Sequence, residues 1–234
     1  MTIFHWLLIA ALVFCFVSCL RWFLKLIKQP KDYADPKGSV ADGVTFSCTK
    51  AMLPTHKESA YLHLPTYIAG IIYHIGTFTS IILLLLQLIF TNFMLPYTGN
   101  CEMGDGTSCF IFSSNWTFVV YLRLFFAVAL AVSSLCGVAI LIKRFTNKEL
   151  KALSNIDDYL SNIFVTLFQM FSAIVMVAPY STWTQPALFI MGTILFIYMP
   201  LGKLRHVIYF LSARYQLGAF YGKRGVWSMK NKKH

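Results

Sequence analysis

Residues 67–90 are YIAGIIYHIGTFTSIILLLLQLIF, an apolar run that contains no Asp, Glu, Lys or Arg. About 20 helical residues cross a hydrocarbon core roughly 30 Å thick, so this run is long enough to span a membrane. Four further apolar runs of suitable length lie at residues 4–27, 116–142, 159–177 and 186–211. The sequence therefore predicts an all-α integral membrane bundle of five transmembrane helices, in a single domain that covers residues 1–234.

The composition supports the membrane class. Of the 234 residues, 57% are hydrophobic and 12% are charged, which is more apolar surface than a soluble domain of this size could bury. Outside the spans, the longest polar segments are a loop at residues 28–66 and a basic tail at residues 212–234. Prolines and glycines in the loop predict that no long helix forms there.

The 20 Lys and Arg residues predict an orientation. They gather in residues 21–57, 143–151 and 203–233, and Arg123 is the single exception. With five spans these three segments face the same side, and segments rich in Lys and Arg face the cytoplasm. We therefore expect the N-terminus outside and the C-terminus inside. The net charge of +11 is not expected to serve nucleic acid, because aromatic residues interleaved with a solvated basic face are missing.

Two histidines lie inside the apolar runs. His74 is roughly 10 Å below the inner end of the second run, and His206 is roughly 12 Å above Arg214, which marks the inner end of the fifth. An ionisable residue in hydrocarbon is costly and marks a functional site by default. Taken singly, each histidine is better explained as a hydrogen-bonded core residue or as part of a proton path. Two histidines at matching depth on different spans favour a pair of axial ligands to one haem iron.

The neighbours of the two histidines suit a haem. Three small residues follow the first histidine within two turns: Gly76, Thr77 and Ser80. Three cations flank the second histidine: Lys203, Arg205 and Arg214. Small side chains would let the macrocycle approach the helix backbone, and cations pair with haem propionates.

His63 is a further candidate on the second span. It precedes His74 by 11 residues, close to three helical turns, so a continuous helix would place both on one face. Pro65 argues against that continuity and predicts that His63 lies at the mouth of the span. It is a candidate for a second inner ligand or for a proton relay.

Other polar residues in the spans have simpler explanations. Arg123 is expected to extend towards the outer surface, with a quinone headgroup or an acidic partner as the alternative contact. Gln87 and Gln169 are expected to form interhelical hydrogen bonds. Asn155, with Asp158 three residues later, predicts the start of the fourth span, and the alternating charges before it predict a short surface helix.

The six cysteines fall into three groups. Those within spans are Cys15, Cys19 and Cys136, and we expect them to be small packing residues. Cys48 lies in the inner loop, where its thiol stays reduced. Cys101 and Cys109 flank a Gly-rich turn on the outer side and are either a disulfide or two unpaired thiols. No CxxC, CxxCH or zinc-type spacing occurs, which argues against iron–sulfur clusters, c-type haem and structural zinc within the chain.

Three segments carry a family resemblance: YHIG at residues 73–76, PLGKLRHVIYF at 200–210 and ARYQLGAFYGKRG at 213–225. With them the chain resembles the gamma subunit of respiratory nitrate reductase and its relatives, the five-span membrane cytochromes b. Some of these relatives serve heterodisulfide-reductase-like and other complexes of anaerobic respiration. The resemblance implies a haem b held by His74 and His206, a membrane quinone such as menaquinone as redox substrate, an inner iron–sulfur partner subunit, and the prokaryotic cytoplasmic membrane.

The chain departs from this family at a second ligand pair. Nitrate reductase members hold an outer haem at the positions that correspond here to Leu84 and Leu188, and leucine cannot ligate iron. Met191 is the only soft donor nearby. The comparison implies one haem, and His63 is the remaining route to a second.

Two functions follow from these observations. The first is an electron-transfer subunit that leaves substrate chemistry to its partners, because the sequence shows no carboxylate pair, no nucleophile with a base and no phosphate-binding loop. The second is a haem-free membrane anchor or transporter, whose signature would be inverted repeats or spans broken at the midplane. Pro200 is the clearest break in a span.

Overall fold

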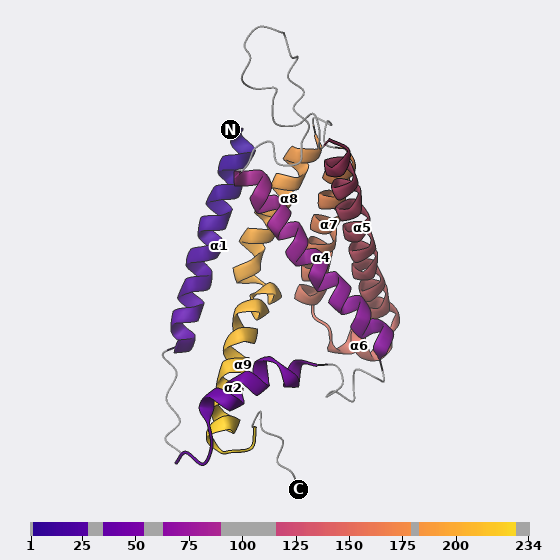
Figure 1. Cartoon of the computed structure of the whole chain (residues 1–234). Helices are drawn as coiled ribbons and strands as arrows, with labels where there is room; N and C mark the ends of the chain where they lie inside the picture. Colours follow the sequence, from indigo (N-terminus) through magenta and orange to yellow (C-terminus); the bar gives the residue numbers. More distant parts are fainter. Residues whose placement is uncertain (1, 28–34, 54–62, 90–115, 179–182, 228–234) are drawn as a thin grey trace, which may run out of the picture. The chain divides into compact units, whose positions relative to one another are not determined.

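The computed structural model describes residues 2–27, 35–53, 63–89, 116–178 and 183–227, and their regular elements are all helical (Figure 1). In chain order the helices are α1 (Ile3–Ile27), α2 (Val40–Cys48), η1 (Lys50–Met52), α4 (Leu64–Ile89), α5 (Trp116–Thr146), α6 (Lys148–Leu153), α7 (Ile156–Val177), α8 (Thr184–Leu201), η3 (Lys203–Arg205) and α9 (His206–Lys223). Of these, α1, α4, α5, α7 and α8 are long and apolar enough to cross a membrane. The predicted class, an all-α protein with five transmembrane helices, is confirmed.

The fifth span is shorter than the sequence predicted. One helix was expected across residues 186–211, but α8 ends at Leu201. Pro200 has no N–H for a helical hydrogen bond, and Gly202 is extended, with φ −99° and ψ −164°. A Cβ on Gly202 would lie 2.4 Å from the ring of Tyr198, so a larger residue here would have to displace that ring. The chain then makes the 3₁₀ turn η3 and restarts as α9, and it remains helical through the first half of the segment predicted as a tail.

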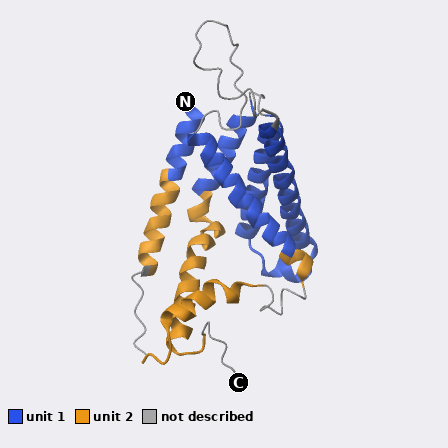
Figure 2. Cartoon of the chain, viewed as in Figure 1, with its two compact units in different colours: residues 1–12, 68–197 blue, residues 13–67, 198–234 orange. Residues whose placement is uncertain are grey.

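The chain forms two compact units, which Figure 2 shows in different colours. Unit 1 consists of residues 1–12 and 68–197, and unit 2 consists of residues 13–67 and 198–234. Helices pack against one another within each unit, as described below for unit 1 and then for unit 2.

In unit 1, α4, α5 and α7 share an apolar core. Its buried members are Leu83, Ala127, Leu130, Ala173 and Met176, with Phe126 packed against them. Small residues bring the helices close, as is typical of membrane bundles. A Cβ on Gly76 of α4 would lie 2.0 Å from Ser133 Oγ of α5, and one on Gly137 of α5 would lie 2.4 Å from the ring of Tyr73.

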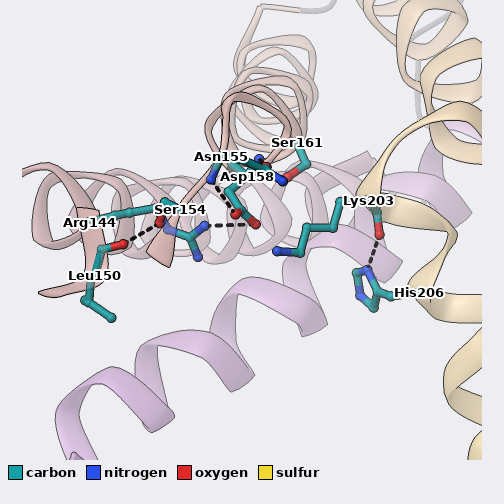
Figure 3. A network of polar contacts seen from close by, with 8 residues as sticks. All are labelled: Arg144, Leu150, Ser154, Asn155, Asp158, Ser161, Lys203 and His206. Carbon is teal, nitrogen blue, oxygen red and sulfur yellow. Dashed lines mark hydrogen bonds and ion pairs between the residues drawn. The ribbon is translucent and has the colours of Figure 1, made fainter. Parts of the chain in front are cut away.

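The start of α7 is fixed by the predicted signal. Asn155 Oδ1 accepts from the backbone N–H of Asp158, and the Asp158 carboxylate accepts from the backbone N–H of Asn155, which together form a capping box. Asp158 is buried and pairs with Arg144 at 3.1 Å (Figure 3). The short helix α6 between them is capped by Asn147. Both expectations for this loop, the surface helix and the start of the span, are confirmed.

In unit 2, α2 packs backbone to backbone on α9. A Cβ on Gly43 of α2 would lie 2.2 Å from Gly218 O and 2.3 Å from Gly222 Cα, both in α9. At the end of α9, Lys223 O accepts from the backbone N–H of Lys37 at 2.8 Å. We call this α2–α9 contact the glycine clasp. It ties the loop after the first span to the C-terminal helix.

The loop between α1 and α4 contains only short helices in its described part. α2 has nine residues and η1 has three, which agrees with the prediction that no long helix forms there. Beside the clasp, the rings of Phe46, Tyr221 and Trp227 gather, with Trp227 4.6 Å from Tyr221 and 5.5 Å from Phe46.

Candidate functional site

His74 lies on the exposed face of α4 in unit 1. Its Nδ1 is 2.7 Å from the backbone oxygen of Gly70, one turn earlier in the helix. A carbonyl oxygen can only accept, so Nδ1 carries the proton and the lone pair lies on Nε2. Metal-binding histidines almost always donate their other ring N–H to a carbonyl or carboxylate in this way. The imidazole is therefore oriented as a ligand would be.

The small residues near His74 are arranged differently from the expectation. Gly76, Thr77 and Ser80 were expected to open space beside this histidine, but they lie on the buried face of α4, where Gly76 packs on α5 and Thr77 binds Gln169. The open position is Gly70, where a Cβ would meet no atom within 4 Å. Because helical residues four apart lie on one face, Gly70 and His74 share a face of α4. The sequence analysis missed Gly70, although the Gly-x-x-x-His spacing of residues 70–74 could have pointed to it.

His206 is the first residue of α9 in unit 2. It was expected deep inside a continuous fifth span, but it follows the end of α8 and the turn η3, so the argument from matched depth no longer holds. Its Nδ1 is 2.9 Å from Lys203 O (Figure 3), again a carbonyl that can only accept. The lone pair of His206 is therefore also on Nε2. The two histidines belong to different units and share this hydrogen-bonding arrangement.

Two of the three predicted cations lie in the same turn as His206. Lys203 and Arg205 form η3 directly before it, and both are exposed. Arg205 lies over the ring of Trp22 at 5.7 Å. Arg214 is two turns further along α9, over the ring of Phe210 at 5.5 Å. The structure therefore groups Lys203 and Arg205 with the histidine and places Arg214 apart from them.

His63 lies just outside α4, as the sequence predicted for a mouth residue. The helix begins at Leu64, and Pro65 occupies its first turn, where a missing N–H costs nothing. The side chain is exposed, and the backbone oxygen of His63 accepts from Tyr67 N at 3.0 Å.

The positions of the family's second ligand pair are packed with apolar side chains. Leu84 and Leu188 are 0% and 2% exposed. A Cβ on Gly192 of α8 would lie 2.7 Å from Leu84 Cδ2 and 3.3 Å from Leu8 Cδ1. The side chains of Leu84 and Leu8 therefore pack against Gly192 within unit 1.

Arg123 faces the bundle and does not extend into solvent. Its side chain is 7% exposed, and Nη2 donates to Met176 O at 2.7 Å. Met176 lies in the last turn of α7, where carbonyls lack helical partners and a cation is favourable. This contact replaces the expected outward extension.

The two buried glutamines differ. Gln169 joins three helices: its Oε1 accepts from Ser133 Oγ at 2.7 Å, and its Nε2 donates to Tyr73 O at 3.0 Å and Thr77 Oγ1 at 2.7 Å. This confirms the expected interhelical hydrogen bonds. Gln87 is 2% exposed, and neither atom of its amide has a hydrogen-bond partner among the residues that the structure describes.

This difference predicts opposite effects of the same substitution. Gln169→Leu is expected to lower the free energy of unfolding by about 1–2 kcal/mol, because it leaves buried polar groups on α4 and α5 without their hydrogen-bond partner. Gln87→Leu is expected to raise it by about 1 kcal/mol, because it removes a buried amide that has no partner. Thermal unfolding of both variants in one detergent measures the contrast. An equal loss in both would mean that Gln87 has a ligand in the native protein.

The cysteines are distributed between the units and the loops. Cys15 is buried and Cys19 half-buried in α1, Cys136 is half-buried in α5, and Cys48 is exposed at the end of α2. Cys101 and Cys109, expected to be either a disulfide or two unpaired thiols, lie outside the described residues. Within the described ranges, no three His, Cys, Asp or Glu side chains come together as a metal site.

No family model, curated protein or solved structure matches this chain.

Proposed function

We propose that this chain is the haem b-carrying membrane subunit of a respiratory oxidoreductase complex, related to the gamma subunit of nitrate reductase. The observation that carries the proposal is the shared arrangement of His74 and His206. Each donates Nδ1–H to a backbone carbonyl and so has its lone pair on Nε2, the atom that would bind iron. The sequence resemblance supports the same two residues.

Features of each unit, taken separately, support a haem. The open position at Gly70 leaves room for a flat macrocycle against the backbone of α4, beside His74. Lys203 and Arg205 supply the charge that propionates need, next to His206. When bound, haem b would supply a one-electron centre between a membrane quinone and an iron–sulfur partner subunit. The chain itself orients the imidazoles and would anchor the haem propionates.

Charge supports the proposed orientation and partner. No Asp or Glu follows Asp158, so η3 and α9 carry only positive charge. We place this basic end on the cytoplasmic side of a prokaryotic membrane, where it would dock an acidic iron–sulfur subunit through electrostatic complementarity. Substrate chemistry would belong to other subunits of the complex.

The haem-free alternative, a membrane anchor or transporter, is less well supported. Transporter sites use helices broken near the membrane midplane. The break at Pro200 and Gly202 lies at the end of α8, beside the cationic turn that precedes His206.

The spectrum of the purified full chain tests the proposal. The reduced-minus-oxidised spectrum is expected to show a b-type α band with one haem per chain, and His74→Ala or His206→Ala is expected to abolish it. Exogenous imidazole should restore part of the band in each variant, because it replaces a lost ligand but does not repair a folding defect. His63→Ala is the matched control and should keep the band. A wild-type chain without haem refutes the proposal, and a second haem refutes the inference drawn from Leu84 and Leu188.

A further inference from the structure

We propose that Cys15, Cys19 and Met199 form a binding site for Cu(I) in unit 2. The Cys15 thiol lies 3.7 Å from Met199 Sδ and 3.9 Å from Cys19 Sγ. Cys15 and Cys19 are one turn apart on α1, whereas Met199 comes from the end of α8, 184 positions later. Three sulfur donors from two helices thus meet at one thiol.

The distances suit a metal held by sulfur alone. A thiolate–metal bond is about 2.3 Å long. Three such sulfurs around one ion lie about 4.0 Å apart in a trigonal plane and about 3.8 Å apart on the faces of a tetrahedron, by simple geometry from that bond length. The two separations measured from the Cys15 thiol, 3.7 Å to Met199 Sδ and 3.9 Å to Cys19 Sγ, lie in this range.

The chemistry of the donors selects the ion. Thiolate and thioether are soft ligands, which favour Cu(I) over hard cations such as Mg²⁺ or Ca²⁺. Zn²⁺ prefers four ligands, commonly histidine or carboxylate besides cysteine, and this site offers three sulfurs.

Burial gives the site a closed side and an entrance. Cys15 is 6% exposed, so solvent does not reach it directly. Cys19 is half-buried and lies nearer the end of α1 that carries Arg21 and Lys25. An ion would enter past Cys19. Each thiol that ligates the metal releases its proton to the solvent, so binding releases up to two protons and transfers no electron.

Local helix geometry explains only one of the two contacts. Side chains four apart on a helix are neighbours, so the Cys15–Cys19 approach would occur on any helix with this spacing. The approach of Met199 requires α8 to lie against α1 in unit 2. Methionine fills irregular gaps in cores, so packing alone is the competing explanation, and the experiment has to separate packing from binding.

A competition experiment with a Cu(I) chelator distinguishes packing from metal binding. The purified full chain, kept reduced and free of oxygen, is titrated against the Cu(I) complex of the chromogenic chelator bicinchoninate. We expect the wild-type chain to withdraw one equivalent of copper. Loss of a group that only hydrogen-bonds to a metal ligand costs about 10–100-fold in metal affinity. Loss of a ligand itself, in Cys15→Ala, Cys19→Ala or Met199→Leu, should therefore weaken Cu(I) binding at least about tenfold. Met199→Leu is the sharpest variant, because it conserves volume and removes only the sulfur.

Control variants and spectroscopy complete the test. Cys136→Ala and Cys48→Ala remove thiols that lie elsewhere and should bind copper like the wild type. X-ray absorption at the copper edge should show three sulfur neighbours. The proposal is overturned if the wild type takes no copper, if Met199→Leu binds as tightly as the wild type, or if histidine nitrogen appears among the neighbours. A Cys15–Cys19 disulfide in the protein as isolated would also overturn it. Haem content is measured separately, so failure here leaves the haem proposal untouched.

Discussion

Replacing Gly43 with alanine is expected to break the glycine clasp and to destabilise unit 2 by about 3 kcal/mol. The added Cβ would lie 2.2 Å from Gly218 O and 2.3 Å from Gly222 Cα. Both are backbone atoms of α9, so no side chain can rotate away, and the two helices must separate. Gly218→Ala acts from the other side, because its Cβ would lie 2.5 Å from Val44 Cα. Hydrogen exchange in α2 measures the effect, and it should approach the rate of an open loop in both variants.

Gly70→Ala is the matched control for the clasp variants. Gly70 is also a helical glycine, but a Cβ there meets no atom within 4 Å. Alanine favours a helix over glycine by up to about 1 kcal/mol, so this control is expected to be neutral or stabilising. If Gly43→Ala exchanges no faster than Gly70→Ala, α2 and α9 are not in contact in the native protein.

The clasp has a consequence for the proposed ligand His206. This histidine is the first residue of α9, and the clasp holds the second half of the same helix. Loosening α9 should therefore lower haem occupancy without touching either imidazole. A clasp variant that keeps full occupancy would show that α8 and η3 alone position His206.

Hydropathy and local signals predicted the helices well, because the ends of a helix depend mainly on residues close together in the sequence. The capping box of Asn155 and Asp158 is an interaction across three positions, and the sequence contains all of it. Four of the five spans begin and end within a few residues of their predicted limits for the same reason.

Pro200 was named as the clearest break in a span, but the fifth span was still predicted to continue, because residues 207–211 are again apolar or aromatic after the charged turn. What ends α8 is a proline without an N–H and a ring lying over a glycine. The glycine clasp and the bond from Arg123 to Met176 O were out of reach for a different reason. They join segments far apart in the chain, and nothing in the local sequence records the partner. For the same reason, the contact between Met199 and Cys15 could not be predicted from the sequence.

Gly70→Leu is expected to abolish haem binding while leaving the helical bundle intact. The proposed haem would lie against α4 at His74, and Gly70 is the position one turn away where the backbone is open. A leucine side chain would occupy that space. The bond to His74 Nδ1 uses the backbone oxygen of Gly70, so the substitution leaves the orientation of the imidazole unchanged. Leucine also favours the helix over glycine, so the thermal midpoint should stay the same or rise.

Ile71→Leu is the control for this variant. Ile71 is exposed on the same helix, one position later, and the substitution conserves volume. Haem per chain and the midpoint of thermal unfolding are measured on the same preparations. Lost haem with an unchanged midpoint in Gly70→Leu, against full haem in Ile71→Leu, places the macrocycle on this face of α4. Full haem in Gly70→Leu would place the macrocycle elsewhere.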